Sequence, residues 1–239
     1  MPDLPEHSSP KAARILAAAG ELLLARGSKG VTIADVATRA HIGKGTVYLY
    51  WKTKEDLLLG LVSRDFIGLA DDVTEAVTAD PDLARPSRLL PDMLATAARH
   101  PFVDALRRGD DGLLGALTDD PRSAKLLETL SPDAMMYGVL PIWRRHALAR
   151  TDWPLAEQAL ALHALLTGFL KAPAPSRFRP GPVVPEEVLA KAVTALLGPE
   201  QATPAQVRAT AAEGLQALAD ARVTALELIA VPAAPAPAN

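Results

Sequence analysis

A short stretch near the N-terminus combines cationic, hydroxyl and aromatic side chains at positions suited to nucleic-acid binding. Ammonium groups and hydroxyls bind the phosphate backbone, and side chains that enter a groove read the base edges. The spacing places several of these groups on a helix only about two turns long. The candidate side chains are those of Lys44, Thr46, Tyr48 and Tyr50.

The distribution of charge supports this interpretation. The chain of 239 residues carries a net charge of −3. Residues 11–54 contain eight basic and two acidic side chains, a net charge of +6, so the remaining 17 basic and 26 acidic residues carry −9. The acidic average therefore conceals a basic segment, which is the asymmetry expected of a protein with one phosphate-binding domain.

Four helices are predicted to position the basic segment. Apolar residues recur at i, i+3 and i+4 in residues 11–26, and no proline lies between residues 11 and 80. Thr32 and Asp35 form a capping pair for a second, short helix, and Thr53 caps a long helix that extends to about residue 79. A tight turn at 41–43 separates the second helix from a third at 44–51. Two short helices joined in this way predict a helix-turn-helix.

Composition predicts helices for the rest of the chain. Alanine and leucine dominate the 49% hydrophobic fraction and aromatic residues make up 4%, which favours an all-α fold. Prolines after residue 80 stand where helical runs begin, but Pro91 and Pro141 fall inside two of these runs and are expected to kink or shorten them. The expected helices are 87–99, 101–108, 111–118, 122–130, 133–149, 154–171, 185–197 and 204–229.

Several functional classes are disfavoured by residues that the sequence lacks. The absence of cysteine rules out disulfides, thiolate catalysis and cysteine zinc sites, and the five histidines have no metal-like spacing. No nucleophile–base pair or cofactor loop is evident, so we expect no metal, no cofactor and no enzymatic activity. No apolar run approaches the roughly 20 residues of a membrane span, and residues 1–11 do not form a signal peptide. We therefore expect no membrane partner and a cytoplasmic location.

Residues 30–57 resemble the N-terminal domain of the TetR family of transcriptional regulators. The resemblance is strong over about the first 60 residues, and beyond them it rests on length, helical character and the long fourth helix. His41 stands where the family usually has glycine, and Gly43 where it has a polar residue. The matching residues are Gly30-Val31-Thr32, Val36-Ala37, Ala40-His41-Ile42, Lys44-Gly45-Thr46-Val47-Tyr48, Tyr50-Trp51 and Lys54-Glu55-Asp56-Leu57.

The resemblance implies a ligand-responsive repressor that binds double-stranded, palindromic operator DNA as a homodimer. Its N-terminal three-helix helix-turn-helix domain would bind DNA, and its C-terminal helical bundle would bind a ligand and dimerise. Carried over by position, Lys44, Gly45 and Thr46 lie at base edges. Phosphate contacts fall to Thr32, Tyr48, Tyr50 and Lys54.

The resemblance also implies an effector site and a dimer interface in the C-terminal domain. The effector would be a small apolar or amphipathic molecule, and candidate lining residues are the large side chains of Met93, Phe102, Met136, Tyr137, Trp143 and His146. Each of these could instead be core. The helices 154–171 and 185–197 match the family's dimer interface, although both could be interior. Candidate interface residues are Leu155, Ala159, Leu162, His163, Leu166 and Leu170.

The expected domain organisation is a disordered arm (1–10), a helix-turn-helix domain (11–56), a ligand-binding and dimerisation domain (57–198) and a C-terminal extension helix with a disordered tail (199–239). The extension has a periodic apolar face that could join the interface or cover the pocket: Val207, Ala211, Leu215, Leu218, Leu226 and Ile229. Two alternatives to the ligand-responsive repressor remain. One is a DNA-binding or interaction module without small-molecule control, and the other, disfavoured, is a helical enzyme.

Overall fold

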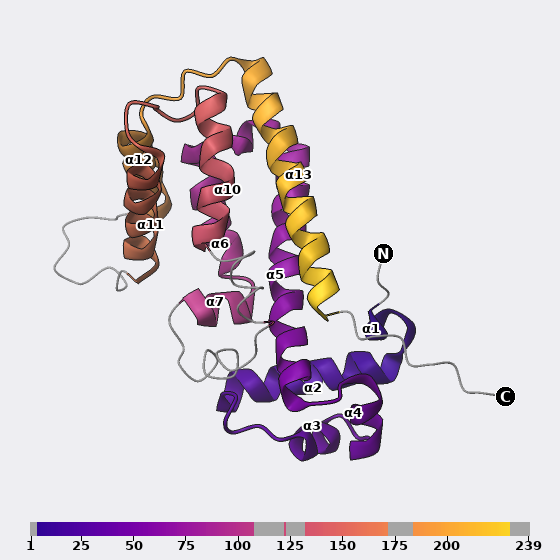
Figure 1. Ribbon diagram of the computed structural model, residues 1–239. Coiled ribbons are helices and arrows are strands. Elements are labelled where there is room, and N and C mark those ends of the chain that lie inside the picture. Colours follow the sequence, from indigo (N-terminus) through magenta and orange to yellow (C-terminus); the bar gives the residue numbers. More distant parts are fainter. Residues whose placement is uncertain (1–3, 108–121, 123–131, 172–183, 230–239) are drawn as a thin grey trace.

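A computed structural model describes residues 4–107, 122, 132–171 and 184–229 (Figure 1). Every regular element in these ranges is a helix, which confirms the predicted all-α fold class. None of the described helices is both long and apolar enough to cross a membrane. The expected helices 111–118 and 122–130 lie outside the described residues, apart from residue 122.

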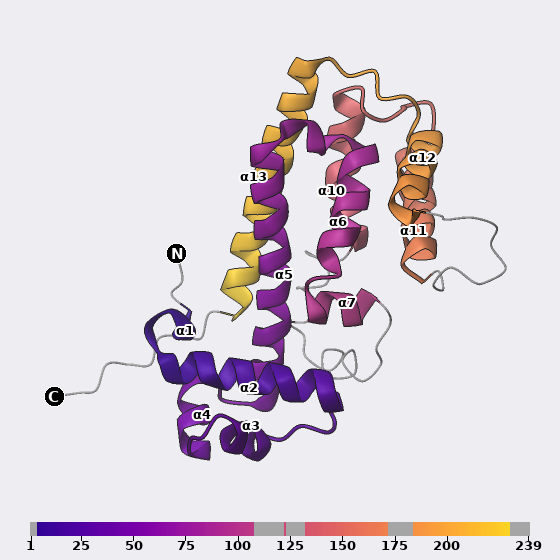
Figure 2. The same cartoon turned by 180° about the vertical axis from the view of Figure 1, so that it is seen from behind.

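The predicted helix-turn-helix is present at the N-terminal end of the molecule. It comprises α2 (Pro10–Arg26), α3 (Ile33–Arg39) and α4 (Lys44–Tyr50), and α2 lies across the base of the long helix α5 (Lys54–Ala79) (Figure 2). Val47 and Trp51 are 0% and 2% exposed and attach the short α4 to the core. A two-turn helix is marginal in water, so this burial is what holds α4 in place.

Side-chain caps begin α3 and α5, as the two Thr-x-x-Asp sequences predict. The Asp35 amide donates to Thr32 Oγ1 at 3.2 Å, and the Asp56 amide donates to Thr53 Oγ1 at 3.0 Å. Each aspartate also accepts from the backbone amide of its threonine, which completes a capping box. The caps fix where both helices start, and with them the position of the turn between.

The turn between α3 and α4 requires a left-handed residue, and His41 supplies it with φ of +55°. The Ile42 amide donates to the Ala37 carbonyl at 3.0 Å and the His41 amide to the Thr38 carbonyl at 3.2 Å, a Schellman motif. Non-glycine residues adopt this conformation at a cost. The fold therefore tolerates the departure from glycine noted at this position.

Helix α5 connects two hydrophobic cores. Its N-terminal half, including Leu58 and Val62, packs with α2, α3 and α4 in the first core. Its C-terminal half, including Val73 and Val77, belongs to the second core. The second core also contains residues of η1 (Pro81–Ala84), α6 (Pro86–Ala97), α7 (Pro101–Arg107), α10 (Pro132–Arg145), α11 (Leu155–Lys171) and α12 (Pro185–Leu197).

Prolines begin most helices of this second region, as predicted, and the two internal prolines do not end the helices that contain them. Helices α6 and α10 continue through Pro91 and Pro141. Helix α10 ends at Arg145 rather than near residue 149, because Ala147 adopts φ of +58° and the Leu148 amide donates back to the Trp143 carbonyl at 2.8 Å. A second Schellman motif thus ends this helix early.

The C-terminal helix α13 (Pro204–Ile229) runs beside α5 along most of the molecule (Figure 1). Val207 and Ala211, near its start, are buried in the second core. Leu226 and Ile229, at its end, are buried in the first core with the helix-turn-helix. The predicted apolar face is confirmed, but its partners are the two cores, so α13 is not a separate extension.

The expectation of a disordered arm is wrong for residues 4–10. Residues 5–8 form a short helix, α1 (Pro5–Ser8), and Leu4 is 6% exposed in the first core. Glu6 forms an ion pair with Arg64 of α5, in which Nη2 lies 2.8 Å from Oε2. One buried apolar side chain and one ion pair therefore hold the segment, although its proline and serine content predicts disorder.

Candidate nucleic-acid interface

Helix α4 presents one face to the core and the opposite face to solvent. Val47 marks the inner face. At 100° per residue, Gly45 and Leu49 lie on the opposite side of the helix. Leu49 is 78% exposed and Tyr48 is 50% exposed. The outer face is thus available for contact with another molecule.

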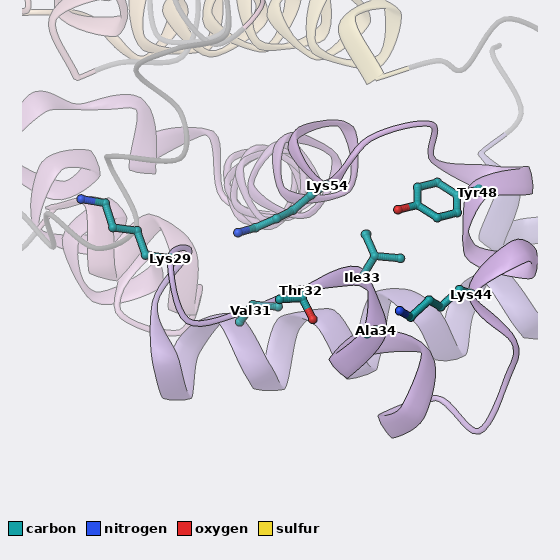
Figure 3. A pocket seen from close by; sticks show the side chains of 8 residues that line it. All are labelled: Lys29, Val31, Thr32, Ile33, Ala34, Lys44, Tyr48 and Lys54. Carbon is teal, nitrogen blue, oxygen red and sulfur yellow. The ribbon is translucent and has the colours of Figure 1, made fainter.

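A basic hollow lies beside this outer face (Figure 3). Its cationic groups come from three places: Lys29 from the α2–α3 loop, Lys44 from the first turn of α4, and Lys54 from the first turn of α5. The surface between them is provided by Val31, Thr32, Ile33, Ala34 and Tyr48. Three lysines and a tyrosine line this one depression, which gives a basic surface complementary to a phosphate backbone.

The loop that carries Lys29 is held tightly. A Cβ on Gly30 would lie 2.6 Å from the carbonyl oxygen of Arg26, a separation that van der Waals radii forbid. Lys54 Nζ donates to the Ser28 carbonyl oxygen at 2.5 Å. This bond orients the Lys54 side chain over the loop, and an ammonium group has further donors for a phosphate.

Thr32 and Asp35 form a closed hydrogen-bonded pair at the edge of the hollow. The Thr32 hydroxyl donates to Asp35 Oδ2 at 2.6 Å while accepting from the Asp35 amide. The side-chain and backbone hydrogen bonds from Thr32, with smaller effects of Arg26 and Lys44, hold the pKa of the Asp35 carboxyl below its usual value. The Thr32 hydroxyl hydrogen is therefore already used, and a phosphate contact requires exchange of this bond.

Tyr50 differs from Tyr48 in its surroundings. Its side chain is half-buried against the first core, and its hydroxyl lies 2.6 Å from Ser9 Oγ. Its ring also packs against that of Trp51, with centroids 5.8 Å apart. Tyr50 thus joins α4 to the N-terminal segment, and its predicted phosphate contact requires the Ser9 hydrogen bond to open. Tyr48, in contrast, faces the hollow directly.

Two residues of this surface were missed by the sequence analysis. Lys29 was counted in the basic segment 11–54 but was not singled out as a contact residue, because its position depends on how the α2–α3 loop folds. Leu49 is apolar, and an apolar residue in a short helix is usually read as packing. The signal for Leu49 was its position two residues after Val47, which places it on the opposite face.

The predicted effector-lining residues are separated in the structure. Phe102 is buried in the first core and Trp143 in the second, where its Nε1 donates to the Ala84 carbonyl at 2.9 Å. Met93 packs at the edge of the second core, and Tyr137 is 54% exposed. His146 Nε2 lies 2.7 Å from Glu213 of α13. The Met136 side chain lies outside the described part of the chain.

The predicted dimer residues are mostly interior. Ala159, Leu162 and Leu166 are 2%, 0% and 7% exposed and belong to the second core, which agrees with the interior alternative for these three positions. Leu155 is 38% exposed, His163 is partly buried with Nε2 lying 3.3 Å from Thr167 Oγ1, and the Leu170 side chain is not described. Helical periodicity identified an apolar face, but that face packs within the protomer.

The helix-turn-helix with its basic hollow has the architecture of a DNA-binding domain, and comparison with known proteins finds relatives of this segment. Residues 15–61 match the family model described as bacterial regulatory proteins, tetR family. The helix-turn-helix segment is therefore similar to the N-terminal segment of these regulators.

Individual relatives extend this comparison. A fatty acid metabolism regulator protein of Bacillus subtilis (strain 168) is 35% identical over 83 residues, which cover 33% of this chain and 43% of that protein. The chain therefore spans less than half of this relative. The structure of the fatty acid degradation regulator FadR from Bacillus halodurans aligns with a TM-score of 0.53 and 18% identity, over 82% of this chain and 98% of that one. FadR from Bacillus subtilis, solved in complex with stearoyl-CoA, aligns with a TM-score of 0.50 and 17% identity, over 77% and 96%.

Proposed function

We propose that this protein is a transcriptional repressor that binds a palindromic operator as a homodimer and is released by a small amphipathic effector. The observation that carries the proposal is the basic hollow formed by Lys29, Lys44 and Lys54 beside the exposed outer face of α4. Phosphate contacts provide affinity and register, and the outer face of α4 provides sequence discrimination in the major groove.

The residues of the interface divide between these two tasks. Lys29 in the α2–α3 loop and Lys54, whose ammonium group donates to that loop, bind phosphates in the proposed complex, with Tyr48 adding a hydroxyl. Lys44, Gly45 and Thr46 form the first turn of α4, where a helix in the major groove brings its side chains to base edges.

A selection of bound fragments from genomic DNA, followed by fluorescence anisotropy on the selected operator, tests DNA binding. Lys44→Ala is expected to lose about 1–3 kcal/mol of operator-binding free energy and to relax specificity at one base pair. Lys54→Ala is expected to weaken binding to all DNA sequences alike and to reduce the slope of log affinity against log salt concentration by about 1. Arg208→Ala, which removes an exposed cation of α13 outside both proposed interfaces, is the matched control and retains wild-type affinity. Wild-type binding by both interface variants would overturn the proposal.

Dimerisation through α11 and α12 is the second part of the proposal. Since Ala159, Leu162 and Leu166 are interior, the interface must use the outer faces of these helices, where Leu160 is 66% and Val188 is 41% exposed. Val188→Glu is expected to shift the sedimentation coefficient to that of a monomer. Val223→Glu, on a similarly exposed valine of α13, leaves the dimer intact. A dimer that survives Leu160→Glu and Val188→Glu together excludes this interface.

The effector is the third part of the proposal. The matched Bacillus regulators are named for fatty acid metabolism or degradation, and one of them was solved with stearoyl-CoA. A long-chain acyl-CoA is therefore the first effector class to test. Stearoyl-CoA is expected to raise the melting temperature and to dissociate the operator, whereas free CoA at the same concentration does neither. If no acyl-CoA does both, the module without small-molecule control is the better description.

A further inference from the structure

The centre of the outer face of α4 carries no polar side chain. Gly45 and Leu49 are one turn apart on this face, opposite the buried Val47. A Cβ on Gly45 would have no protein atom within 4 Å, and Leu49 is the most exposed of the large apolar side chains in the described residues. Neither residue has a packing task within the protomer.

The surroundings of Leu49 identify the kind of molecule that would cover it. Lys29, Lys44 and Lys54 surround the adjacent hollow. An apolar protein partner would have to desolvate these ammonium groups without neutralising them, which is costly. Duplex DNA neutralises them with phosphates and also offers one apolar group in its major groove, the 5-methyl group of thymine.

We propose that Leu49 reads the 5-methyl group of a thymine in each operator half-site, and that Gly45 permits the close approach this contact requires. The inference rests on the proposed operator binding. The contact is dispersive and hydrophobic, with no hydrogen bond. The absent side chain at Gly45 leaves the backbone of α4 as the surface nearest the bases. Sequence preference at this thymine therefore arises from its methyl group and from the fit between the α4 backbone and the major groove.

Deoxyuridine differs from thymidine only by that methyl group, so it provides a direct test. Each thymine of the selected half-site is replaced in turn, and anisotropy measures the affinity of the wild type, Leu49→Ala and Leu24→Ala. Leu24 is a 49% exposed leucine on α2 and serves as the matched control. At one or two positions, removing the methyl group is expected to weaken wild-type and Leu24→Ala binding about threefold to fivefold, and to leave Leu49→Ala binding unchanged.

The outcomes separate this inference from the proposed function. One outcome is that the wild type binds the operator yet loses no more affinity than Leu49→Ala when any thymine is replaced by deoxyuridine. That result excludes methyl readout by Leu49, while operator binding stands. If the wild type binds no DNA, both proposals fail. Circular dichroism verifies the fold of each variant, and the exposed Leu49 can be truncated without creating a cavity.

Gly45→Ala provides a second measurement on the same contact. Alanine has a higher helix propensity than glycine and meets no protein atom here, so the melting temperature is expected to rise or stay constant. Operator affinity is nevertheless expected to fall, because the new methyl group lies between α4 and the bases. Unchanged affinity for Gly45→Ala would exclude the close approach.

Discussion

At the scale of single residues, His41 and Ala147 adopt a backbone conformation that costs free energy for any residue other than glycine. Both are positive-φ, non-glycine residues in the described part of the chain, with φ of +55° and +58°. Each occupies the left-handed position of a Schellman motif, where glycine is the usual residue. The predicted departure from glycine at His41 was recognised from the family pattern, whereas Ala147 had no such pattern to signal it.

Ala147→Gly is therefore expected to stabilise the protein. Relief of the left-handed conformation exceeds the entropy that glycine adds to the unfolded chain, for a net gain of about 0.5–1 kcal/mol. Urea denaturation at neutral pH measures the change. Ala217→Gly, at an exposed position inside α13, is the control and loses about 1 kcal/mol. Destabilisation by both substitutions would contradict the argument.

The candidate site was predictable at this scale where local chemistry decides, and not where tertiary packing decides. The capping pairs Thr32–Asp35 and Thr53–Asp56 were predicted from spacing alone, since a cap involves residues three apart. The half-buried position of Tyr50 depends on Ser9, which is 41 residues away in sequence. Tyr48 and Tyr50 were therefore predicted to have the same role, although Tyr48 is exposed and Tyr50 is half-buried.

At the scale of elements, the helix α1 shows how composition can mislead. Prolines and serines predict a disordered arm, but prolines at the first helical positions of α1 and α2 are compatible with short, well-defined helices. The deciding contacts are Leu4 in the first core and Glu6 against Arg64. Both partners lie elsewhere in the sequence, so no local pattern could reveal them.

The Glu6–Arg64 ion pair makes the anchoring of α1 dependent on pH. Burial raises the pKa of the Glu6 carboxyl, but the hydrogen bonds and positive charge of Arg64 outweigh it and hold the pKa below its ordinary value of 4.5. A lowered pKa means that ionised Glu6 stabilises the folded state above pH 4.5, and that this stabilisation declines as the pH falls through the folded-state value.

Glu6→Gln is accordingly expected to be less stable than wild type at neutral pH by about 1.5–3 kcal/mol, because it removes a charged hydrogen bond from a mostly buried pair. The difference should shrink as the pH is lowered from 5 toward 3. Chemical denaturation across this range measures it. Glu187→Gln, an exposed glutamate in the first turn of α12, provides the control for a general loss of negative charge. A difference that grows with acidity would refute the assignment.

At the scale of the whole molecule, α5 and α13 run antiparallel to each other, and both connect the helix-turn-helix to the second core (Figure 1). The periodicity of residues 207–229 predicted a packed face but not its partners. That information depends on how the chain returns after α12. The Arg222–Asp71 ion pair, with Nε and Oδ1 2.7 Å apart, adds a polar link between the two helices.

The last turns of α13 thus pack in the first core with the helix-turn-helix, although they lie far from it in sequence. Leu226 is 4% exposed in the first core, and Val207 is 3% exposed in the second. Leu226→Ala leaves a cavity under the helix-turn-helix and is expected to cost about 2–5 kcal/mol. Because this cavity lies within the first core, amide hydrogen exchange should accelerate in α2 and in the first half of α5 more than in α11 and α12.

Val207→Ala is the matched variant, since it truncates the same helix at its other end. It is expected to accelerate exchange in α6 and α12 and to leave operator affinity at 25 °C unchanged. If both variants accelerate exchange equally throughout the chain, the two cores unfold as one unit. In that case, α13 stabilises the whole molecule without acting on the helix-turn-helix in particular. If Leu226→Ala instead lowers protection from amide exchange selectively in α2, α13 directly supports the helix-turn-helix.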